Sequence, residues 1–452
     1  MQKYLEVLNH VVWGAPALVL ILGVGFFLTF RIGFAQFSFF PRAIHLFFAR
    51  LTGRKKQGEV SPIRALCTAL AATVGTGNLV GVAGAICLGG PGSIFWMWIC
   101  GLLGMGTKFA EATLAVRYQV RKNGENYAGP MYMILQGLPH RWHWLGVVYS
   151  FFGVIAAFGV GNATQINGVI ISVNRTMEKI GIMPTWQGNL LLGTGLGILI
   201  GTLFSGGAKR IGQWAEVLVP FVSCGYLALC LGVLMVNANA IPNAFASILQ
   251  GAFSPQAVTG GMVASGFSAL RVGVSRGVFT NEAGMGTASI AHGAADVTHP
   301  AEQGLMGIME VFLDTIFMCT MTALVILISG VSIPYGTDSG GILTLAAFVN
   351  VYGDWVTVFL SFSLCCFALA TVLGWGLYGA RCAQFLFGER AWKIFAILQS
   401  VMVVLAAVMQ TGMIWSLAET VNGLMAIPNL IALAALSPEL RRLTIEYKKF
   451  CG

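Results

Sequence analysis

Charged residues are scarce in this sequence. Only 10% of the 452 residues are Asp, Glu, Lys or Arg, whereas 56% are apolar and the mean hydropathy is +0.78. Soluble domains carry roughly 25% charged residues, so a soluble core is not expected to hide so much apolar surface. Apolar runs of about 20 residues recur along the chain, and each is long enough to cross a hydrocarbon layer of roughly 30 Å. The sequence therefore predicts an integral membrane protein.

Signatures of several other protein classes are missing. Neither the ten cysteines nor the six histidines show metal-ligand spacing, and no C-x-x-C pair occurs. A Walker lysine motif and an H-E-x-x-H motif are also absent, so nucleotide hydrolysis and zinc peptidase chemistry are not indicated and no organic cofactor is expected. The net charge of +9 belongs to no separate basic domain, which argues against nucleic acid as a partner.

Eleven apolar segments, bounded by polar, glycine or proline residues, predict an all-α polytopic protein. Their approximate ranges are 11–30, 65–88, 94–116, 145–173, 189–204, 215–236, 262–292, 304–330, 355–380, 392–408 and 411–436. No long linker or low-complexity stretch separates them, so we expect a single transmembrane domain over residues 1–452. An odd number of crossings places the two termini on opposite sides.

Lysine and arginine indicate the orientation, because positively charged residues are retained on the cytoplasmic side. Most of them fall on one side in this count, namely Arg42, Arg50, Arg54, Lys55, Lys56, Arg64, Arg117, Arg121, Lys122, Arg141, Lys209, Arg210, Arg390, Lys393, Arg441, Arg442, Lys448 and Lys449. The opposite side holds only Lys3, Arg175 and Lys179. One miscounted helix would destroy this agreement. We predict a multi-pass protein of the cell membrane with its N-terminus outside and its C-terminus in the cytoplasm.

Two of the predicted helices are interrupted by glycine-rich polar stretches, at residues 73–78 and 279–287. Irregular backbone is tolerated at membrane depth only where it lines a cavity, and its freed amides and carbonyls suit a carboxylate and a dehydrated cation. Close helix packing is the alternative explanation for the glycines. Asn78, Asn281 and Glu282 favour a binding site, because polar side chains are costly in lipid.

The interrupted helices are five crossings apart, as an inverted repeat of two five-helix halves requires. We expect repeat one to cover about 65–236 and repeat two about 262–436. The helix at 11–30 then lies outside the repeat as an addition.

The interruptions and their surroundings carry a family resemblance. The matching stretches are 71–78 (Ala-Ala-Thr-Val-Gly-Thr-Gly-Asn), 89–92 (Gly-Gly-Pro-Gly), 95–98 (Phe-Trp-Met-Trp), 129–132 (Gly-Pro-Met-Tyr) and 281–286 (Asn-Glu-Ala-Gly-Met-Gly). In these stretches, and through most of helices two to nine, the chain resembles the alanine or glycine:cation symporter family. The resemblance implies sodium coupling and the five-plus-five inverted-repeat fold of the bacterial leucine transporter.

The same resemblance implies a set of substrate-binding residues. The set comprises Thr76, Gly77, Asn78, Gln165, Thr280, Asn281, Gly284 and Met285. By this likeness the amides of Thr76 and Gly77 meet the substrate carboxylate, and Met285 closes on the substrate's side chain. Gln165 is either a further substrate ligand or a partner in an interhelical hydrogen bond.

The resemblance also implies a sodium site between the first interrupted helix and the ninth helix. Carbonyl groups of the former and a hydroxyl of the latter are the ligands in that fold, and the matching positions are Ala71, Val74 and Thr371. Family members commonly carry a second hydroxyl beside that threonine, whereas this chain has Ala370.

Charged side chains inside the predicted helices need partners, because an unpaired charge is costly in a membrane. Lys108 and Glu111 are three residues apart on the third predicted helix, so we expect a structural ion pair between them, with a role in transport as the alternative. Two arginines of the seventh predicted helix are expected to form ion pairs with buried carboxylates. Alternatively, these carboxylates form a gate or a proton relay. The arginines are Arg271 and Arg276, and the candidate acids are Glu282, Glu310 and Asp314.

The leading hypothesis is a symporter in the lipid bilayer that imports alanine or glycine with sodium by alternating access, without an obligatory protein partner. A membrane enzyme that uses Glu282 or Asp314 as acid or base, a sensor with the transporter fold, and a symporter of a larger neutral amino acid are the alternatives. The sequence fixes neither the transported amino acid nor the ion stoichiometry.

Overall fold

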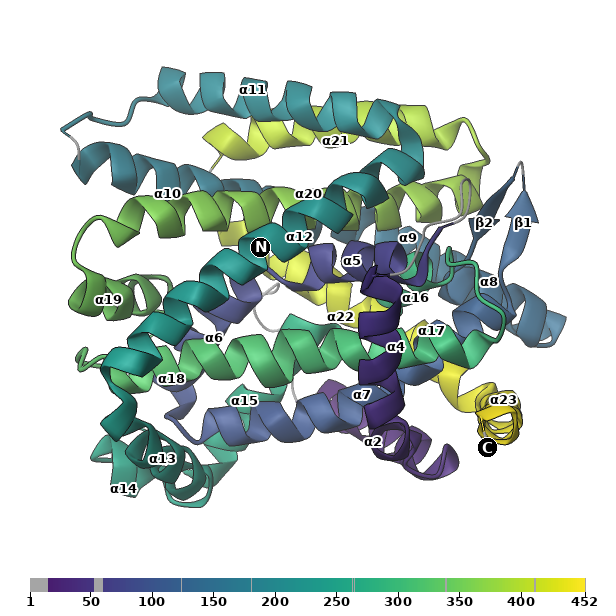
Figure 1. The fold of residues 1–452 in the computed structure, drawn as a ribbon. Coiled ribbons are helices and arrows are strands. Elements are labelled where there is room, and N and C mark those ends of the chain that lie inside the picture. The colour runs from purple at the N-terminus through teal and green to yellow at the C-terminus, as the bar shows by residue number, and fades with distance from the viewer. Residues whose placement is uncertain are drawn as a thin grey trace.

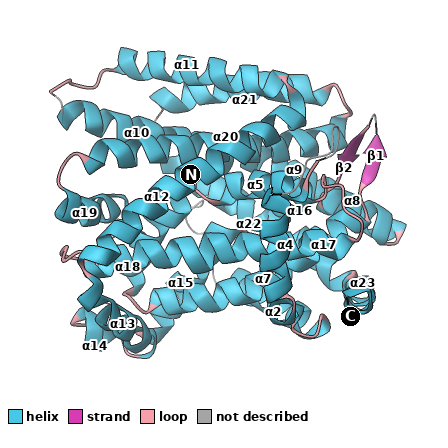
Figure 2. Cartoon of the chain, in the orientation of Figure 1, coloured by secondary structure: helices cyan, strands magenta, loops and turns pink. Residues whose placement is uncertain are grey.

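The computed structural model describes residues 15–52, 60–122, 124–179, 181–261, 263, 265–337, 340–409 and 412–451. In these residues the regular secondary structure is helical apart from one short hairpin, whose strands β1 (Val120–Lys122) and β2 (Glu125–Tyr127) pair antiparallel (Figure 2). Lys3, Arg54, Lys55 and Lys56 of the predicted charge pattern lie outside the described residues.

Each predicted range of the first half contains helix, and short connecting elements lie between them. They are α2 (Ala15–Arg31), α3 (Ala35–Ser38), α4 (Phe40–Thr52), α5 (Pro62–Thr73), η1 (Gly77–Gly81), α6 (Val82–Gly89), α7 (Ser93–Arg117), α8 (Pro130–Gly137), η2 (His140–Trp142), α9 (Trp144–Phe158), η3 (Gly159–Ala163), α10 (Thr164–Lys179), α11 (Trp186–Ser205) and α12 (Gly207–Val236).

Each predicted range of the second half also contains helix. Its helices are η4 (Ala238–Ala240), α13 (Ile241–Phe253), α14 (Pro255–Thr259), α15 (Gly266–Asn281), α16 (Thr287–His292), α17 (Pro300–Val311), η5 (Phe312–Cys319), α18 (Thr320–Ile328), α19 (Gly340–Tyr352), α20 (Val356–Phe387), α21 (Ala391–Val408), α22 (Gly412–Ala435) and α23 (Ser437–Cys451). Three of the elements, η1, η3 and η5, are π-helical.

The long helices run across the view of Figure 1 in roughly one direction and form an all-α bundle. Among the described residues, seven helices are long and apolar enough to cross a membrane, or up to nine if each sharply bent pair is counted as one span. Each of the eleven predicted ranges contains helix, so the polytopic fold class is confirmed. The number of crossings stays a prediction.

The first interruption is a sharp break with local causes on both sides. Ser61 caps the start of α5 by accepting a hydrogen bond from the Arg64 amide, and Pro62 occupies the first turn, where its missing N–H costs nothing. The helix ends at Val74, whose ψ of 108° is extended. After the break the chain resumes as η1 and α6, at an angle of 53° to α5.

The second interruption separates α15 from α16. Glu282 ends α15 in the left-handed region with φ of 53°, and Gly284 and Gly286 follow with φ of 92° and 80°. Glycine adopts such angles at little cost, whereas a residue with a side chain is strained there. The glycine-rich stretches thus break the helices at the positions predicted from the sequence.

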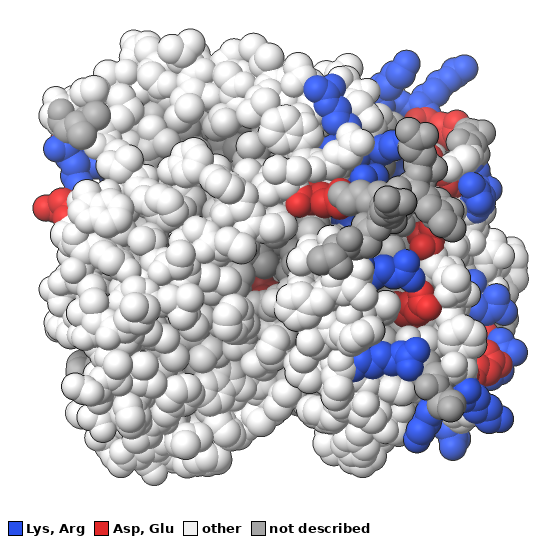
Figure 3. Space-filling view, in the orientation of Figure 1, with Lys and Arg blue, Asp and Glu red and all other residues white. Residues whose placement is uncertain are grey.

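The outer surface has two distinct regions, a long apolar band and a basic end. Large apolar side chains on α11 and α12 face outward, and Leu191, Val217 and Phe221 are 76%, 71% and 67% exposed, as suits contact with lipid. Figure 3 shows Lys and Arg gathered at one end of the molecule, the end that carries the β hairpin and α23 in Figure 1, and few at the opposite end. The positive charges that the structure describes are therefore segregated, as a fixed membrane orientation requires.

Candidate functional site

The first broken helix exposes backbone groups where α5 ends. In a continuous helix the Gly75 amide would bond to the Ala71 carbonyl, but here it donates to Asn78 Oδ1 at 2.9 Å. The Ala71 carbonyl therefore lacks its helical donor and is free to meet a ligand. Asn78 itself is fully buried, so its side chain acts as an internal cap for the break.

Helix α20 brings a hydroxyl against this opening. A Cβ atom built on Gly75 would lie only 2.9 Å from Thr371 Oγ1, which means that the hydroxyl nearly touches the unwound backbone. The hydroxyl donates to the Phe367 carbonyl at 3.0 Å, and its oxygen can still accept or coordinate. Thr371 thus lies against the unwound backbone at the end of α5, and its place in a sodium site with Ala71 and Val74 stays a prediction.

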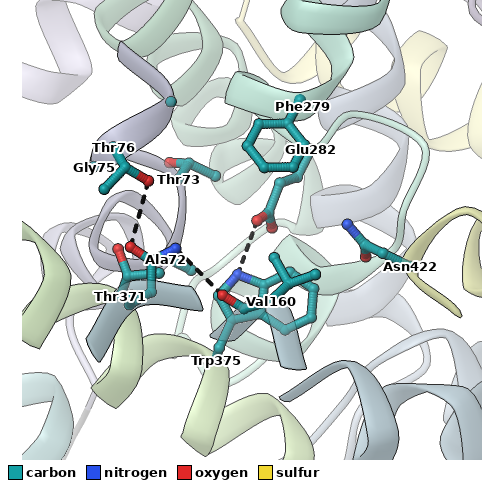
Figure 4. A pocket seen from close by; sticks show the side chains of 12 residues that line it. Ala72, Thr73, Gly75, Thr76, Val160, Phe279, Glu282, Thr371, Trp375 and Asn422 are labelled. Carbon is teal, nitrogen blue, oxygen red and sulfur yellow. Dashed lines mark hydrogen bonds between the residues drawn. The ribbon is translucent and has the colours of Figure 1, made fainter. Parts of the chain in front are cut away.

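A small cavity lies between the two broken helices (Figure 4). It is lined by Ala72, Thr73, Gly75, Thr76, Gly77, Val160, Gln165, Phe279, Glu282, Thr371, Trp375 and Asn422, and its volume is about 20 Å³. On its walls Trp375 Nε1 donates to Glu282 Oε1 at 2.9 Å, and Thr76 Oγ1 donates to Gln165 Oε1 at 3.4 Å. No lysine or arginine is among the described residues that line it. The cavity therefore offers no positive charge to bind a substrate with an acidic side chain.

Four of the predicted site residues line this cavity directly, namely Thr76, Gly77, Gln165 and Thr371. Thr280 lies just behind it, since its Cγ2 is 3.1 Å from the position that a Cβ on Gly77 would take. Asn281 is buried beside Thr280, and its Oδ1 accepts from the Ala283 amide at 2.9 Å.

Gly284 and Met285 lie away from the lining, because a carboxylate of α7 occupies the backbone of the second break. Glu111 Oε1 accepts from the amides of Gly284 and Gly286, each at 3.0 Å, and from Asn429 Nδ2 at 2.8 Å. Met285 is completely buried in the apolar core. The backbone amides of Gly284 and Gly286, which the sequence predicted to be available to a ligand, thus donate to a side chain of the protein itself.

Several lining residues were not foreseen. Trp375 and Asn422 come from α20 and α22, and Val160 comes from the π-helical η3. Helical spacing could have found Trp375, because it follows Thr371 by four residues and so shares its helix face. Asn422 had no such signal in the sequence.

The predicted ion pair between Lys108 and Glu111 is wrong. Lys108 Nζ instead bonds to Glu310 Oε1 on α17 at 2.8 Å, and both side chains are at most 1% exposed. Glu310 Oε2 also meets His292 Nε2 at 2.8 Å, and Gln303 Nε2 meets His292 Nδ1. Helices α7 and α17 pack along much of their length, so the partner across the interface is better placed than the neighbour on the same helix.

The pairing of Arg271 and Arg276 with buried acids stays a prediction, although the acids have other partners. All three candidate acids bond to other groups. Glu282 accepts from Trp375 and Thr287, Glu310 from Lys108 and His292, and Asp314 from Asn78 and Thr315.

Asp314 touches the first broken helix from the π-helical η5. Asn78 Nδ2 donates to Asp314 Oδ1 at 2.7 Å and lies 3.1 Å from the Asp314 carbonyl oxygen, while the Thr315 hydroxyl donates to Asp314 Oδ2 at 2.8 Å. The carboxylate is fully buried. Irregular π-helical turns are frequent at functional sites, and this one holds a charged group beside the cavity backbone.

The apolar bundle, its broken helices and the cavity between them define a multi-pass membrane transporter, and the fold is that of solved transporters. The structure of MhsT in complex with L-phenylalanine matches with a TM-score of 0.59 at 16% identity, over 85% of this chain and 90% of that one. A sodium-coupled sialic acid symporter matches with a TM-score of 0.53 at 14% identity, over 95% and 98%. At such identities the likeness establishes the fold, that of the leucine-transporter class.

The sequence comparisons give the family. The model of the sodium:alanine symporter family matches residues 1–451, and the chain belongs to this family. Sodium/alanine symporter AgcS of Methanococcus maripaludis is 43% identical over 95% of this chain and 93% of its own length. Amino-acid carrier protein AlsT of Bacillus subtilis is 35% identical over 95% and 89%. The protein is therefore a transporter and not an enzyme.

Proposed function

We propose that this protein imports a small neutral amino acid, alanine or glycine, together with sodium by alternating access. Its family supports sodium-coupled amino-acid symport. The observation that carries the choice of substrate is the cavity of about 20 Å³ between the broken helices, which has bulky walls and no cationic lining residue among those described. A cavity of this size has room for little more than one water molecule, so any amino acid needs the walls to move, and a short uncharged side chain needs the smallest movement.

The backbone of the first break is the proposed carboxylate site. The amides of Thr76 and Gly77 begin the helical segment after the break, and the start of a helix favours negative charge. Gln165 Oε1 lies on the same cavity and can accept from the substrate ammonium group. Thr280 packs against Gly77 of this backbone from the second broken helix, Asn281 follows it in the chain as a further proposed substrate ligand, and Asn78 accepts from the Gly75 amide.

The proposed sodium ligands are the carbonyl oxygens of Ala71 and Val74 and the hydroxyl of Thr371. Hard cations prefer oxygen ligands, and the break leaves the Ala71 carbonyl without a helical donor. A sodium ion there would join α5 to α20, so it would bind more tightly to the conformation in which these helices are close. The ion can drive transport only through such a difference in affinity between conformations.

Uptake into proteoliposomes tests this function. We expect labelled alanine to accumulate when sodium is higher outside than inside, and not when a proton gradient replaces the sodium gradient. Thr371→Val, which keeps the shape but removes the hydroxyl, should raise the sodium concentration for half-maximal uptake, whereas Thr371→Ser should preserve it. Sodium-independent uptake by the wild type, or equal sodium dependence of both variants, would contradict the proposal.

Competition identifies the substrate. Unlabelled glycine and both enantiomers of alanine should compete with labelled alanine better than leucine, phenylalanine or glutamate do. If leucine competes as well as alanine does, the small cavity does not select by size and a larger neutral amino acid becomes the favoured substrate.

The proposed orientation places the basic end of the molecule in the cytoplasm. Single cysteines introduced at Arg442 on α23 and at Lys179 on α10 lie at opposite ends of the charge distribution. In intact cells a membrane-impermeant thiol reagent should label the cysteine at position 179 and not the one at 442. The reverse pattern would show that the C-terminus is outside.

A further inference from the structure

A chain of buried polar side chains lies outside the substrate cavity. It begins at Lys108, whose Nζ bonds to Glu310 Oε1 at 2.8 Å, and continues from Glu310 Oε2 to His292 Nε2 at 2.8 Å. His292 Nδ1 then meets Gln303 Nε2 at 2.6 Å. All four side chains are at most 1% exposed, and none of them takes part in the proposed binding of substrate or sodium. Polar groups are costly inside a membrane and often functional, so this chain needs an explanation.

The atoms around the His292 ring assign its protonation state. A carboxylate can only accept, so Nε2 carries the hydrogen that it donates to Glu310. The Gln303 amide nitrogen carries hydrogens, so it donates to Nδ1, which must present its lone pair. His292 is therefore neutral, and its Nδ1 is the atom at which a proton can be added.

Gln303 connects this ring to the first broken helix. Its Nε2 also donates to the carbonyl oxygen of Pro62 at 3.4 Å, and Pro62 is the first residue of α5. Its Oε1 is buried and has no hydrogen-bond partner among the described residues. A buried acceptor without a donor is costly, so this oxygen will accept a hydrogen when one becomes available.

We propose that His292 is a proton-binding site that controls the hold on the start of α5. The inference rests on the proposed alternating-access transport and adds a proton to its control. When Nδ1 takes a proton from water, it becomes a donor, and the Gln303 amide turns so that Oε1 accepts from it. Oε1 then occupies the former place of Nε2, where it faces the Pro62 carbonyl. Two oxygen acceptors repel each other, so protonation replaces an attraction at the start of α5 by a repulsion.

A second cavity brings water close to this ring. It lies beside the β hairpin at the basic end, and its volume is about 540 Å³. Ala65 and Thr68 of α5 line it, and so do Ala291 and Ala294, the first of which precedes His292 in the chain. In the proposed orientation this end faces the cytoplasm, so the proton comes from there.

The charges around the ring decide when it binds a proton. Helices α5, α7, α17 and α20 pack against α16. The charged and histidine side chains on these helices and in the loop after α16 are Arg64, Lys108, Glu111, Arg117, Asp296, His299, Glu302, Glu310 and Arg381. Glu310 contacts the ring and attracts its positive charge, whereas Lys108 lies behind Glu310 and opposes that charge. The others bond to partners other than His292, and the thiols and phenols of these helices are neutral at physiological pH.

Proton binding is therefore linked to the position of α5. Burial opposes a charged ring, and this opposition falls when α5 moves away and water enters. The conformation that is open at this end then binds the proton more tightly than the closed one, and by linkage the proton favours the open conformation to the same extent. A more acidic cytoplasm should thus favour the inward-open form.

Nitrogen NMR of isotopically labelled histidine tests the protonation directly. The sample is the purified protein in lipid nanodiscs, and the His292 signals are identified by their loss in His292→Gln. At about pH 8 the ring should carry a hydrogen on Nε2 and none on Nδ1, and at about pH 5.5 both nitrogens should carry one. A ring that is already charged at about pH 8, or that stays neutral at about pH 5.5 in folded protein, overturns the proposal.

The hold on α5 is measured by amide hydrogen exchange, with each rate divided by that of an unstructured chain at the same pH. In the wild type the protection of the first turns of α5 should fall about twofold to tenfold between about pH 8 and about pH 5.5, the factor that one hydrogen bond is worth. His292→Gln can donate to Glu310 but cannot take a second proton, so its protection should not depend on pH. Gln303→Met cannot bond to Pro62, so its protection should be low at both pH values.

His45→Gln is the matched control, because His45 is a histidine of α4, which packs against both α5 and α17. It should keep the pH dependence of the wild type. If the protection of α5 loses its pH dependence in His45→Gln, or keeps it in His292→Gln, the proton does not act at His292 and the proposal is overturned.

These readouts are separate from the proposed function. A wild type that accumulates alanine with sodium, but whose α5 protection does not change with pH, overturns the proton site and leaves the transport function intact. A wild type that fails to accumulate alanine, although His292 takes up a proton and α5 loses protection, overturns the proposed function and leaves the proton site intact.

A second variant guards against misfolding. If His292→Gln does not give folded protein, Gln303→Met decides, because it leaves the histidine in place and removes the amide that turns. A fall in α5 protection with acid that equals the fall in the wild type would then overturn the proposal. Protection that is low and independent of pH in Gln303→Met would support it.

Discussion

Gly75 offers a sharp test of the sodium site between α5 and α20. In Gly75→Ala the new methyl carbon would lie 2.9 Å from Thr371 Oγ1, about 0.5 Å closer than the 3.4 Å at which ordinary contact begins. The Gly75 backbone is not in the positive-φ region, so alanine is not strained by its conformation. The substitution therefore acts on the approach of the two helices, and the hydroxyl has to move away from the opening at the end of α5.

The size of the effect follows from the cost of overpacking. Inserting one carbon into a well-packed site typically costs about 1–3 kcal/mol. If the closed, ion-binding conformation bears this cost, sodium affinity should fall by about 5–150-fold. Thr371→Ala removes the atoms that collide, so the double variant should show less loss than the sum of the two single changes. Such non-additivity is expected for side chains in contact.

The assay is sodium-dependent alanine uptake into proteoliposomes, with the thermal unfolding temperature of each variant measured in parallel. Gly81→Ala is the matched control, because it lies on the same broken helix and its added Cβ would meet nothing within 4 Å. It should behave as the wild type does. If Gly75→Ala is folded and its half-maximal sodium concentration is that of Gly81→Ala, Thr371 does not coordinate the ion and the assignment of this site is refuted.

Three further substitutions probe the groups around the cavity. Glu111→Leu strands three buried donors and should lower the unfolding temperature and abolish uptake, while Glu111→Gln keeps an acceptor and should be much milder; equal effects in calorimetry would exclude the proposed hydrogen bonding. Lys108→Met leaves the buried Glu310 without its lysine and should cost about 3–5 kcal/mol of unfolding free energy, and restoration of stability by adding Glu310→Gln would confirm the cause. Trp375→Phe removes a donor to Glu282 and enlarges the cavity, so the ratio of leucine to alanine uptake should rise; an unchanged ratio would show that Trp375 does not limit substrate size.

Local features of the fold were predictable from the sequence. The breaks at 73–78 and 279–287 follow from glycines that permit non-helical angles and from polar residues that would be costly in an unbroken apolar helix. The helices were also predictable, because an apolar run of about 20 residues indicates a membrane-spanning helix without reference to any other segment. The placement of Thr371 near the first break came from the family resemblance.

Contacts between distant segments were not predictable in the same way. Lys108 and Glu310 are 202 positions apart, and only the packing of α7 on α17 shows that they meet. Helical spacing favoured Glu111, which proved to hold the second break instead. Periodicity identifies residues on one face of a helix, but it does not say which other helix covers that face.

The two broken helices therefore differ in how their backbone groups are used. At the second break the amides of Gly284 and Gly286 are satisfied by Glu111, an anion that belongs to the protein. At the first break the Gly75 amide is held by a neutral side chain, that of Asn78, and the neighbouring residues Thr76 and Gly77 line the cavity. A substrate carboxylate can compete with a neutral acceptor, but it would repel a buried carboxylate. The amino acid should therefore bind in one orientation, with its carboxylate at the first break and its side chain toward Phe279 and the second.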